Sequence, residues 1–257
     1  MKAKTIIKGA LILGLLGLIF VLCSGFVNGF NFNKVSYEEK SYNVNLNRSF
    51  DINTSSVKLE SHEGEDIKIL YNEDKKYDIK DNNNVISIKE ETNKKKWYEY
   101  IFHFGTKDTF DVVIYLPNTV YENIKINSDV ANIELENIDC YNLDININVG
   151  NVNLNENTIA IANMYIDCGS IELDNSHIDT VLGRINVGSF DLNDSILSNM
   201  DYEIKTGSAN LVVDGIKNEY NLSLDSNVGS GSQKTTGSTE KYINIDVECG
   251  SINIDFI

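Results

Sequence analysis

The sequence predicts an all-β protein: a parallel β-solenoid with about 19 residues per coil, preceded by a strand-rich cap and an N-terminal transmembrane helix. Three observations predict this fold. An uncharged apolar run lies near the N-terminus, short blocks of similar sequence recur beyond residue 118 at a nearly constant step, and apolar residues alternate with polar ones inside each block. With 257 residues, of which 42% are hydrophobic, the chain is long enough to bury a core.

The uncharged run comprises residues 9–27 and predicts a membrane-spanning helix. At about 1.5 Å per residue it is about 28 Å long, which just spans a bilayer. Lysines at positions 2, 4 and 8 precede it, so the positive-inside rule places residues 1–8 in the cytoplasm and the rest of the chain outside. A cleaved signal peptide is the alternative. Acylation at Cys23 is disfavoured because the preceding Leu22 is bulky.

Three segments are expected after the run. Residues 28–40 form a linker, residues 41–117 form a non-repeating β region that caps the first coil, and residues 118–257 form the solenoid. Strands are expected in the cap region where apolar residues alternate or cluster between turn signals. These strands are residues 42–46, 56–60, 66–71, 85–88 and 110–116.

The repeats are best seen as blocks such as NVGNVNL, each with a pivot residue that is usually glycine. The pivots are Ala131, Gly150, Gly169, Gly188, Gly207, Gly229 and Gly250. The first four steps between pivots are 19 residues, whereas the last two are 22 and 21, which implies loop insertions near Asn218 and Gly237. A fixed period of about 20 residues is typical of a stack in which each unit contacts its neighbours.

Alternation within the repeats predicts which side chains enter the core. Val149 is expected to continue the inward positions of Ile145 and Ile147, and Cys168 is expected at the same position in the next coil. Because the inward face changes phase after the pivot, we expect the backbone to bend at each glycine. Two further inward columns are Leu135, Leu154, Leu173, Leu192 and Leu211, and Cys140, Ile159, Ile178, Leu197 and Ile216. A β-sandwich is the alternative, although identical steps of 19 residues are hard to obtain from one.

The segments DVVIYLP and ENIKINSDVANIEL, followed by serial VGxVxL-type blocks that close on CGSINIDF, resemble the bacterial putative-adhesin family over roughly residues 41–257. This family is a β-strand-repeat domain of unknown function on cell-envelope proteins. The resemblance implies a β-solenoid and no catalytic residues, and some relatives are associated with envelope-stress responses in Gram-positive bacteria. Ala131 departs from the family pattern because it replaces the first pivot glycine.

The charge of the chain restricts its partners. The chain contains 38 Asp and Glu against 22 Lys and Arg, a net charge of -16, which argues against nucleic acid because that partner requires clustered cations. The charge is uneven: residues 111–214 contain three basic and 17 acidic residues, whereas residues 34–110 are nearly neutral. We therefore expect the acidic coils to project away from an anionic membrane or wall.

The four cysteines are expected to remain reduced. Cys168 and Cys249 are predicted in one inward column four coils apart, about 19 Å at about 4.8 Å per strand, which is too far for a disulfide. Cys140 is in another column, and Cys23 is in the membrane segment. We therefore predict Cys140, Cys168 and Cys249 as buried free thiols. The three histidines are scattered, so neither a zinc site nor a cofactor is expected.

Acidic residues in the outward columns are interspersed with asparagine, which relieves repulsion between stacked like charges. Glu172, Asp174 and Asp191 are a candidate calcium site because hard cations bind carboxylate oxygens; the alternative is a solvated face. A polysaccharide-active β-helix enzyme would also use arrayed carboxylates. However, the sequence contains no G-x-S-x-G elbow, so we expect no catalytic residues and no enzymatic activity.

Cations and aromatic residues adjoin in the segment NKKKWYEYIFHFG, residues 93–105. Lys94, Lys95, Lys96 and Trp97 are candidate surface contacts for anionic headgroups or wall polymer. The alternative is a turn followed by a strand whose aromatic residues face the core.

Together these features favour a membrane-anchored, extracytoplasmic and non-enzymatic module of the bacterial cell envelope. Its expected partners are the membrane, through the N-terminal helix, and a wall polymer, a surface ligand or another membrane protein. The alternative is an accessory subunit that regulates a partner membrane sensor.

Overall fold

The computed structural model describes residues 36–43, 48–82, 84–91 and 110–257. These residues are almost entirely β-strand, with one short 3-10 helix, η2 (Lys217–Glu219), among them. The predicted membrane segment, residues 9–27, lies outside the described residues, as do residues 1–8 and most of the linker. Within the described ranges, no helix combines the length and the apolar character needed to cross a membrane.

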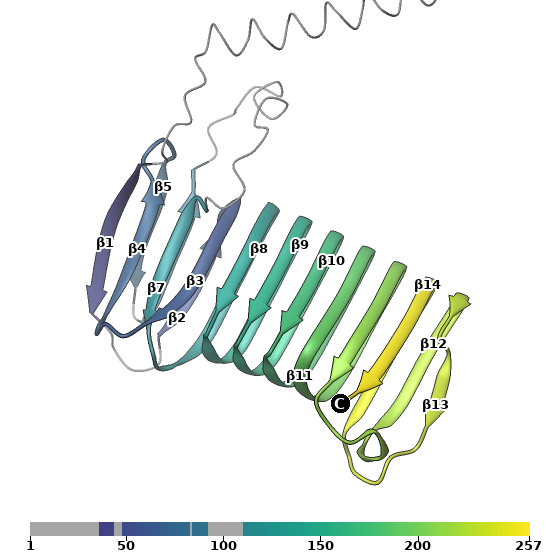
Figure 1. The fold of residues 1–257 in the computed structure, drawn as a ribbon. Coiled ribbons are helices and arrows are strands. Elements are labelled where there is room, and N and C mark those ends of the chain that lie inside the picture. Colours follow the sequence, from purple (N-terminus) through teal and green to yellow (C-terminus); the bar gives the residue numbers. More distant parts are fainter. Residues whose placement is uncertain (1–35, 44–47, 83, 92–109) are drawn as a thin grey trace, which may run out of the picture. The chain divides into compact units, whose positions relative to one another are not determined.

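The central coils stack in parallel and in register (Figure 1). They are β8 (Val120–Glu136), β9 (Asp139–Asn155), β10 (Thr158–Asp174) and β11 (His177–Val213), the last of which contains two successive coils. Paired residues in neighbouring coils are 19 apart in sequence, as in the pairs of Leu154 with Leu135 and Leu173. The all-β fold and the solenoid with a 19-residue coil are therefore confirmed in this part of the chain.

The predicted leucine column lies in the core. Leu135, Leu154, Leu173, Leu192 and Leu211 are all at most 2% exposed. The other predicted column holds from Cys140 to Leu197 but is wrong at Ile216, which is 62% exposed. Tyr220 is buried instead and donates a 2.6 Å hydrogen bond to the Leu197 carbonyl oxygen. Ile216 is displaced because it begins the insertion that contains η2.

The region expected to be a non-repeating cap contains two further parallel coils. β2 (Ser49–Asn53) and β3 (Ser56–His62) pair with the first and second halves of β8. β6 (Val85–Glu90) and β7 (Val112–Pro117) pair in parallel with β2 and β3. The coil β2/β3 precedes β6/β7 in the sequence, yet it lies between β6/β7 and β8 in the stack.

The cap itself is narrower than predicted and is antiparallel. β4 (Asp66–Asn72) pairs with β7, β5 (Tyr77–Asn82) pairs with β6, and β1 (Tyr37–Asn43) pairs with β4. The parallel coils of the structure thus begin at β2, before the first block in which the sequence itself repeats.

The C-terminal coils are also out of sequence order. β14 (Tyr242–Phe256) pairs with β11 on one side and with β12 (Asn221–Ser230) on the other, as Figure 1 shows. The short β13 (Gln233–Thr235) pairs with the outer side of β12. The insertions predicted near Asn218 and Gly237 are present as η2 and the turns after β13, and they let the chain skip one coil position and return.

Glycine at the pivots is required by both backbone conformation and space. Gly150, Gly169, Gly188 and Gly207 have φ between 147° and 153°, which side chains rarely tolerate. A Cβ at Gly188 would lie 1.6 Å from the carbonyl oxygen of Gly169 in the neighbouring coil. Ala131, the one pivot that is not glycine, is not among the residues with positive φ, and its methyl group is buried. Its backbone conformation therefore accommodates a side chain.

The opposite turn of each coil uses left-handed residues and a buried polar column. Asn137, Glu156, Asn175 and Asp194 have φ between 47° and 56°. The column consists of Asn157, Ser176 and Ser195, each at most 2% exposed. The backbone N–H of Asn157 donates to Ser176 Oγ, and the N–H of Ser176 donates to Ser195 Oγ, at 3.1 and 3.0 Å. These bonds satisfy turn amides that would otherwise be buried without partners.

We predict that Gly188→Ala destabilises the protein by about 3 kcal/mol, because it adds a backbone clash to a strained φ. Urea unfolding followed by circular dichroism measures this change. Ala131→Gly is the matched control and should cost about 1 kcal/mol, since it loses one buried methyl group without relieving a clash. Equal effects of the two substitutions would show that pivot contacts do not determine the stacking.

Candidate functional site

The bends of seven coils lie in one line, which we call the glycine edge. Its spatial order follows strand pairing and is Ala131, Gly150, Gly169, Gly188, Gly207, Gly250 and Gly229. Because every pivot except Ala131 lacks a side chain, the residues immediately before and after the pivots dominate this surface.

The residues that precede the pivots form an exposed, mostly apolar column. It consists of Val130, Val149, Cys168, Val187, Thr206, Cys249 and Val228. The four valines are 48% to 67% exposed, and the other three side chains are also exposed. The prediction that Val149, Cys168 and Cys249 point inward is therefore wrong. The bend spreads over four residues, Asn148–Asn151, so the phase of alternation changes before the glycine rather than at it.

The thiols differ in environment. Cys140 is buried, and this burial, together with the nearby Asp139 charge, raises the pKa of its thiol to about 12. Cys168 and Cys249 are free and exposed. They are three coils apart rather than the predicted four, since β14 lies next to β11. A spacing of about 14 Å still prevents a disulfide between them.

Asparagine side chains neutralise the stacking of carboxylates along the outer faces. In six places among the described coils an Asn Nδ2 donates to an Asp Oδ1 in the adjacent coil, at 2.6 to 3.1 Å. The pairs are Asn148–Asp129, Asn163–Asp144, Asn186–Asp167, Asn193–Asp174, Asn210–Asp191 and Asn244–Asp201. The expectation that asparagine relieves repulsion between coils is confirmed, and it does so by direct hydrogen bonds.

The candidate calcium residues take part in these ladders. Asp174 and Asp191 accept hydrogen bonds from asparagine, and Glu172, which pairs with Asp191 across strands, is exposed. In the part of the chain that the structure describes, no group of three or more His, Cys, Asp or Glu could hold a metal ion. The structure therefore does not bring Glu172, Asp174 and Asp191 together as a calcium site.

Lys58 lies on β3, in the same outward column as Glu134, Glu172 and Asp191. Its Nζ contacts carboxylates of Glu134 at 2.8 Å, Glu136 at 2.7 Å and Glu60 at 3.3 Å. Partial burial opposes the charge on Lys58, but hydrogen bonds to Glu134 and Glu136 outweigh it and raise the pKa of the ammonium group. This lysine neutralises acidic residues from two adjacent coils.

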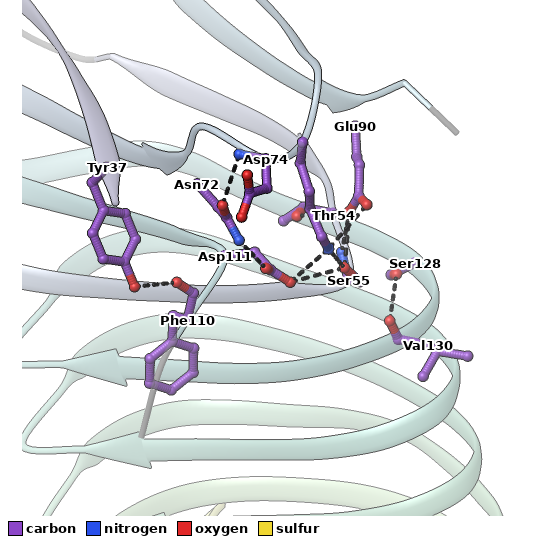
Figure 2. A network of polar contacts seen from close by, with 11 residues as sticks. Tyr37, Thr54, Ser55, Asn72, Asp74, Glu90, Phe110, Asp111, Ser128 and Val130 are labelled. Carbon is purple, nitrogen blue, oxygen red and sulfur yellow. Dashed lines mark hydrogen bonds and ion pairs between the residues drawn. The ribbon is translucent and has the colours of Figure 1, made fainter. Parts of the chain in front are cut away.

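A network of polar contacts connects described residues on either side of residues 92–109, which lie outside the described ranges. Figure 2 shows Glu90 and Asp111, which flank that segment, with Ser55 between them. Ser55 Oγ lies 2.9 Å from Glu90 Oε2 and 3.1 Å from Asp111 Oδ2, and its one hydrogen can be donated to either carboxylate. Lys75 Nζ lies 3.1 and 2.7 Å from the two carboxylates. The network thus connects Glu90 with Asp111. It lies near the bend of β8 that contains Val130, which Figure 2 also shows.

The candidate contacts Lys94, Lys95, Lys96 and Trp97 lie outside the described residues. Sequence reasoning did not identify Lys75, Glu90 or Asp111. They meet because β5 pairs with β6 and β4 pairs with β7, which brings the β4–β5 turn containing Lys75 next to Glu90 at the end of β6 and Asp111 before β7. The β5–β6 pair is a local hairpin, whereas no local pattern signals the pairing of β4 with β7.

The histidines do not form a site within the described ranges. His62 lines a shallow groove of about 510 Å³ with the following residues 63–66 and with residues 117–119, and its Nε2 lies 2.8 Å from the Asp66 carbonyl oxygen. His177 lies 3.6 Å from an Asp179 carboxylate oxygen and is exposed. His103 lies outside the described residues.

We predict that Glu90→Gln flattens the acid limb of the stability curve. Burial alone would raise the pKa of Glu90, but the backbone hydrogen bond from Ser55 and the charge of Lys75 lower it below the usual 4.5. The unfolded chain therefore takes up this proton first, and the stabilisation is present above pH 4.5 and lost as the pH falls from there through the folded pKa. Urea midpoints measured from pH 7 to pH 3 check this. Glu91→Gln is the control, and an unchanged slope for Glu90→Gln would contradict the prediction.

Comparison with known proteins identifies relatives of the described fold. The Toastrack DUF4097 family matches residues 47–256. A crystal structure of a putative adhesin from Bacteroides fragilis NCTC 9343 has a TM-score of 0.55 at 14% identity and covers 86% of this chain and 97% of its own. At this identity the likeness shows the fold alone.

Two further solved structures are less similar. A putative cell adhesion protein from Clostridium sporogenes has a TM-score of 0.42 at 15% identity, covering 86% of this chain and 100% of its own. A putative adhesin from Parabacteroides merdae has a TM-score of 0.43 at 12% identity, covering 87% and 97%. No curated protein matches the sequence.

The family match covers most of the chain and includes the coils on both sides of β8. The resemblance to the bacterial putative-adhesin family is thereby confirmed, and the chain belongs to the Toastrack DUF4097 family.

Proposed function

We propose that this protein is a non-enzymatic, membrane-anchored binding module of the bacterial cell envelope whose stacked coils lie outside the cytoplasmic membrane. The observation that carries the proposal is the register of the coils, which places equivalent outward side chains of successive coils side by side in long columns. A rigid surface with a repeating pattern suits recognition of an extended or repeating partner.

Charge and sequence support the location. The uncharged residues 9–27, preceded by three lysines, have the length and flanks of an anchor with a cytoplasmic N-terminus. The acidic coils would be repelled by anionic lipid and so would extend away from the bilayer. The Bacteroides fragilis protein of the same fold is described as a putative adhesin, and we extend that expectation to this chain.

We predict that a membrane-impermeant maleimide labels the protein on intact cells. The exposed thiols of Cys168 and Cys249 should react, whereas Cys140 should not because it is buried. Labelling of the full chain, measured by mass spectrometry, should be the same before and after cell lysis. The double variant Cys168→Ser/Cys249→Ser is the control and should stay unlabelled. Labelling that requires lysis would contradict an extracytoplasmic location.

We predict that crosslinking on intact cells recovers a specific envelope component with the tagged full chain. A chain that ends before residue 36 is the control and should not recover it, because it lacks the stacked coils. Recovery of wall polymer or a surface ligand supports the proposal. Recovery of a membrane sensor alone would instead favour an accessory subunit, and turnover of a recovered polysaccharide by the purified protein would contradict a non-enzymatic role.

A further inference from the structure

In most coils the glycine edge presents one apolar side chain before the pivot and one polar side chain after it. The mostly apolar column precedes the pivots, and a column of small polar residues follows them. That second column is Asn132, Asn151, Ser170, Ser189, Ser208, Ser251 and Ser230. The hydroxyl of Ser170 donates to Asn151 Oδ1 at 2.8 Å and that of Ser189 donates to Asp191 Oδ2 at 2.9 Å, so these groups are held in place before any partner binds.

The dimensions of the edge suit one extended chain rather than a folded partner. Six steps of about 4.8 Å make it about 29 Å long, and three residues across make it about 10 Å wide. The resulting area of about 290 Å² is well below the roughly 800 Å² per partner of a stable protein interface. A second copy of this acidic chain would also meet like charge along the whole line.

The distance between neighbouring coils can be compared with the repeat distance of each kind of extended chain. Side chains on one side of an extended peptide recur about every 6.6 to 6.8 Å, so a peptide would fall out of step with the coils after one or two contacts. A pyranose ring with its glycosidic oxygen advances by close to one coil step. A linear polysaccharide can therefore place one ring on each coil, with alternate ring faces toward the edge where the linkage is β-1,4.

The neighbouring charges restrict the kind of polysaccharide. Asp129, Asn148, Asp167 and Asn186 form the column next to the exposed valines, and the asparagines donate to the aspartates within it. Residues 111–214 have three basic residues against 17 acidic ones. An anionic polymer would be repelled by this surface, whereas a neutral polymer would not.

We propose that the glycine edge binds a neutral linear polysaccharide, with valines against the apolar faces of successive sugar rings and serine and asparagine side chains at their hydroxyl or amide groups. Binding sites for small polar ligands commonly combine apolar contact with a few placed polar groups in this way. The inference rests on the proposed binding function and assigns the surface and the ligand class.

Calorimetric titration of the full chain in detergent with β-1,4-linked hexasaccharides tests the proposal. The neutral hexamers of N-acetylglucosamine and of glucose are the probes, and an oligogalacturonate of the same length is the anionic comparison. We expect at least one neutral hexamer to bind and the anionic one not to bind. Absence of binding by both neutral probes, or equal binding of the oligogalacturonate, overturns the proposal.

The variant Val149→Asp/Val187→Asp should weaken binding of the neutral probe by about tenfold or more, because it places carboxylates on the apolar column. Ile161→Asp/Ile196→Asp is the matched control, since those side chains are also exposed, at 39% and 40%, and lie away from the edge. It should change affinity by less than about twofold. Circular dichroism checks that both variants fold. Equal affinity of the edge variant and the unsubstituted chain overturns the proposal.

Two further outcomes separate the inference from the proposed function. If the edge variant still recovers its envelope component on cells while neither neutral sugar binds, the inference fails and the binding function stands. If neither assay shows binding, both fail. A dimer in light scattering that the edge variant abolishes would show that the edge is a protein interface, which also overturns the inference.

Discussion

The contact between successive pivot residues determines the register of the whole stack. A Cβ at Gly169, Gly188 or Gly207 would lie 1.6 or 1.7 Å from the carbonyl oxygen of the preceding coil, so the backbones approach as closely as glycine permits. Because neighbouring coils cannot slip by a residue without placing a side chain there, leucine stacks on leucine and asparagine on aspartate. The buried core and the exposed columns both depend on this register.

The ends of the stack are closed by a rearrangement of coil order. The first parallel coil, β2/β3, and the last strand, β14, each lie inside an outer neighbour rather than at the boundary of the stack. Both are therefore paired on two sides, which protects segments near the ends of the described chain from fraying. The outer strand β1 carries Glu38, Glu39 and Lys40, and charges of this kind discourage pairing with another chain.

Surface chemistry follows from the same geometry. A period of 19 residues would stack identical charges, and the chain avoids this by alternating aspartate with asparagine, whose amide donates to the neighbouring carboxylate. On the outer faces asparagine thus pairs with the aspartate of the adjacent coil, whereas the glycine edge leaves a column of valines exposed. The edge differs from the faces because its exposed valines recur from coil to coil, whereas the exposed Ile161 lies between Asn142 and Thr180 of the adjacent coils.

The sequence by itself determined the fold class, the coil length, the leucine column and the positions of the loop insertions, because these are local or strictly periodic. It misplaced Val149 and Cys168, since alternation cannot show that a bend takes four residues rather than one. Only the tertiary structure decided which coils are neighbours at the two ends. Backbone hydrogen bonds accept any block with a glycine pivot, so the order of β12 and β14 depends on a chain crossing that no local pattern encodes. The contact of Lys75 with Asp111 likewise depends on the non-local pairing of β4 with β7.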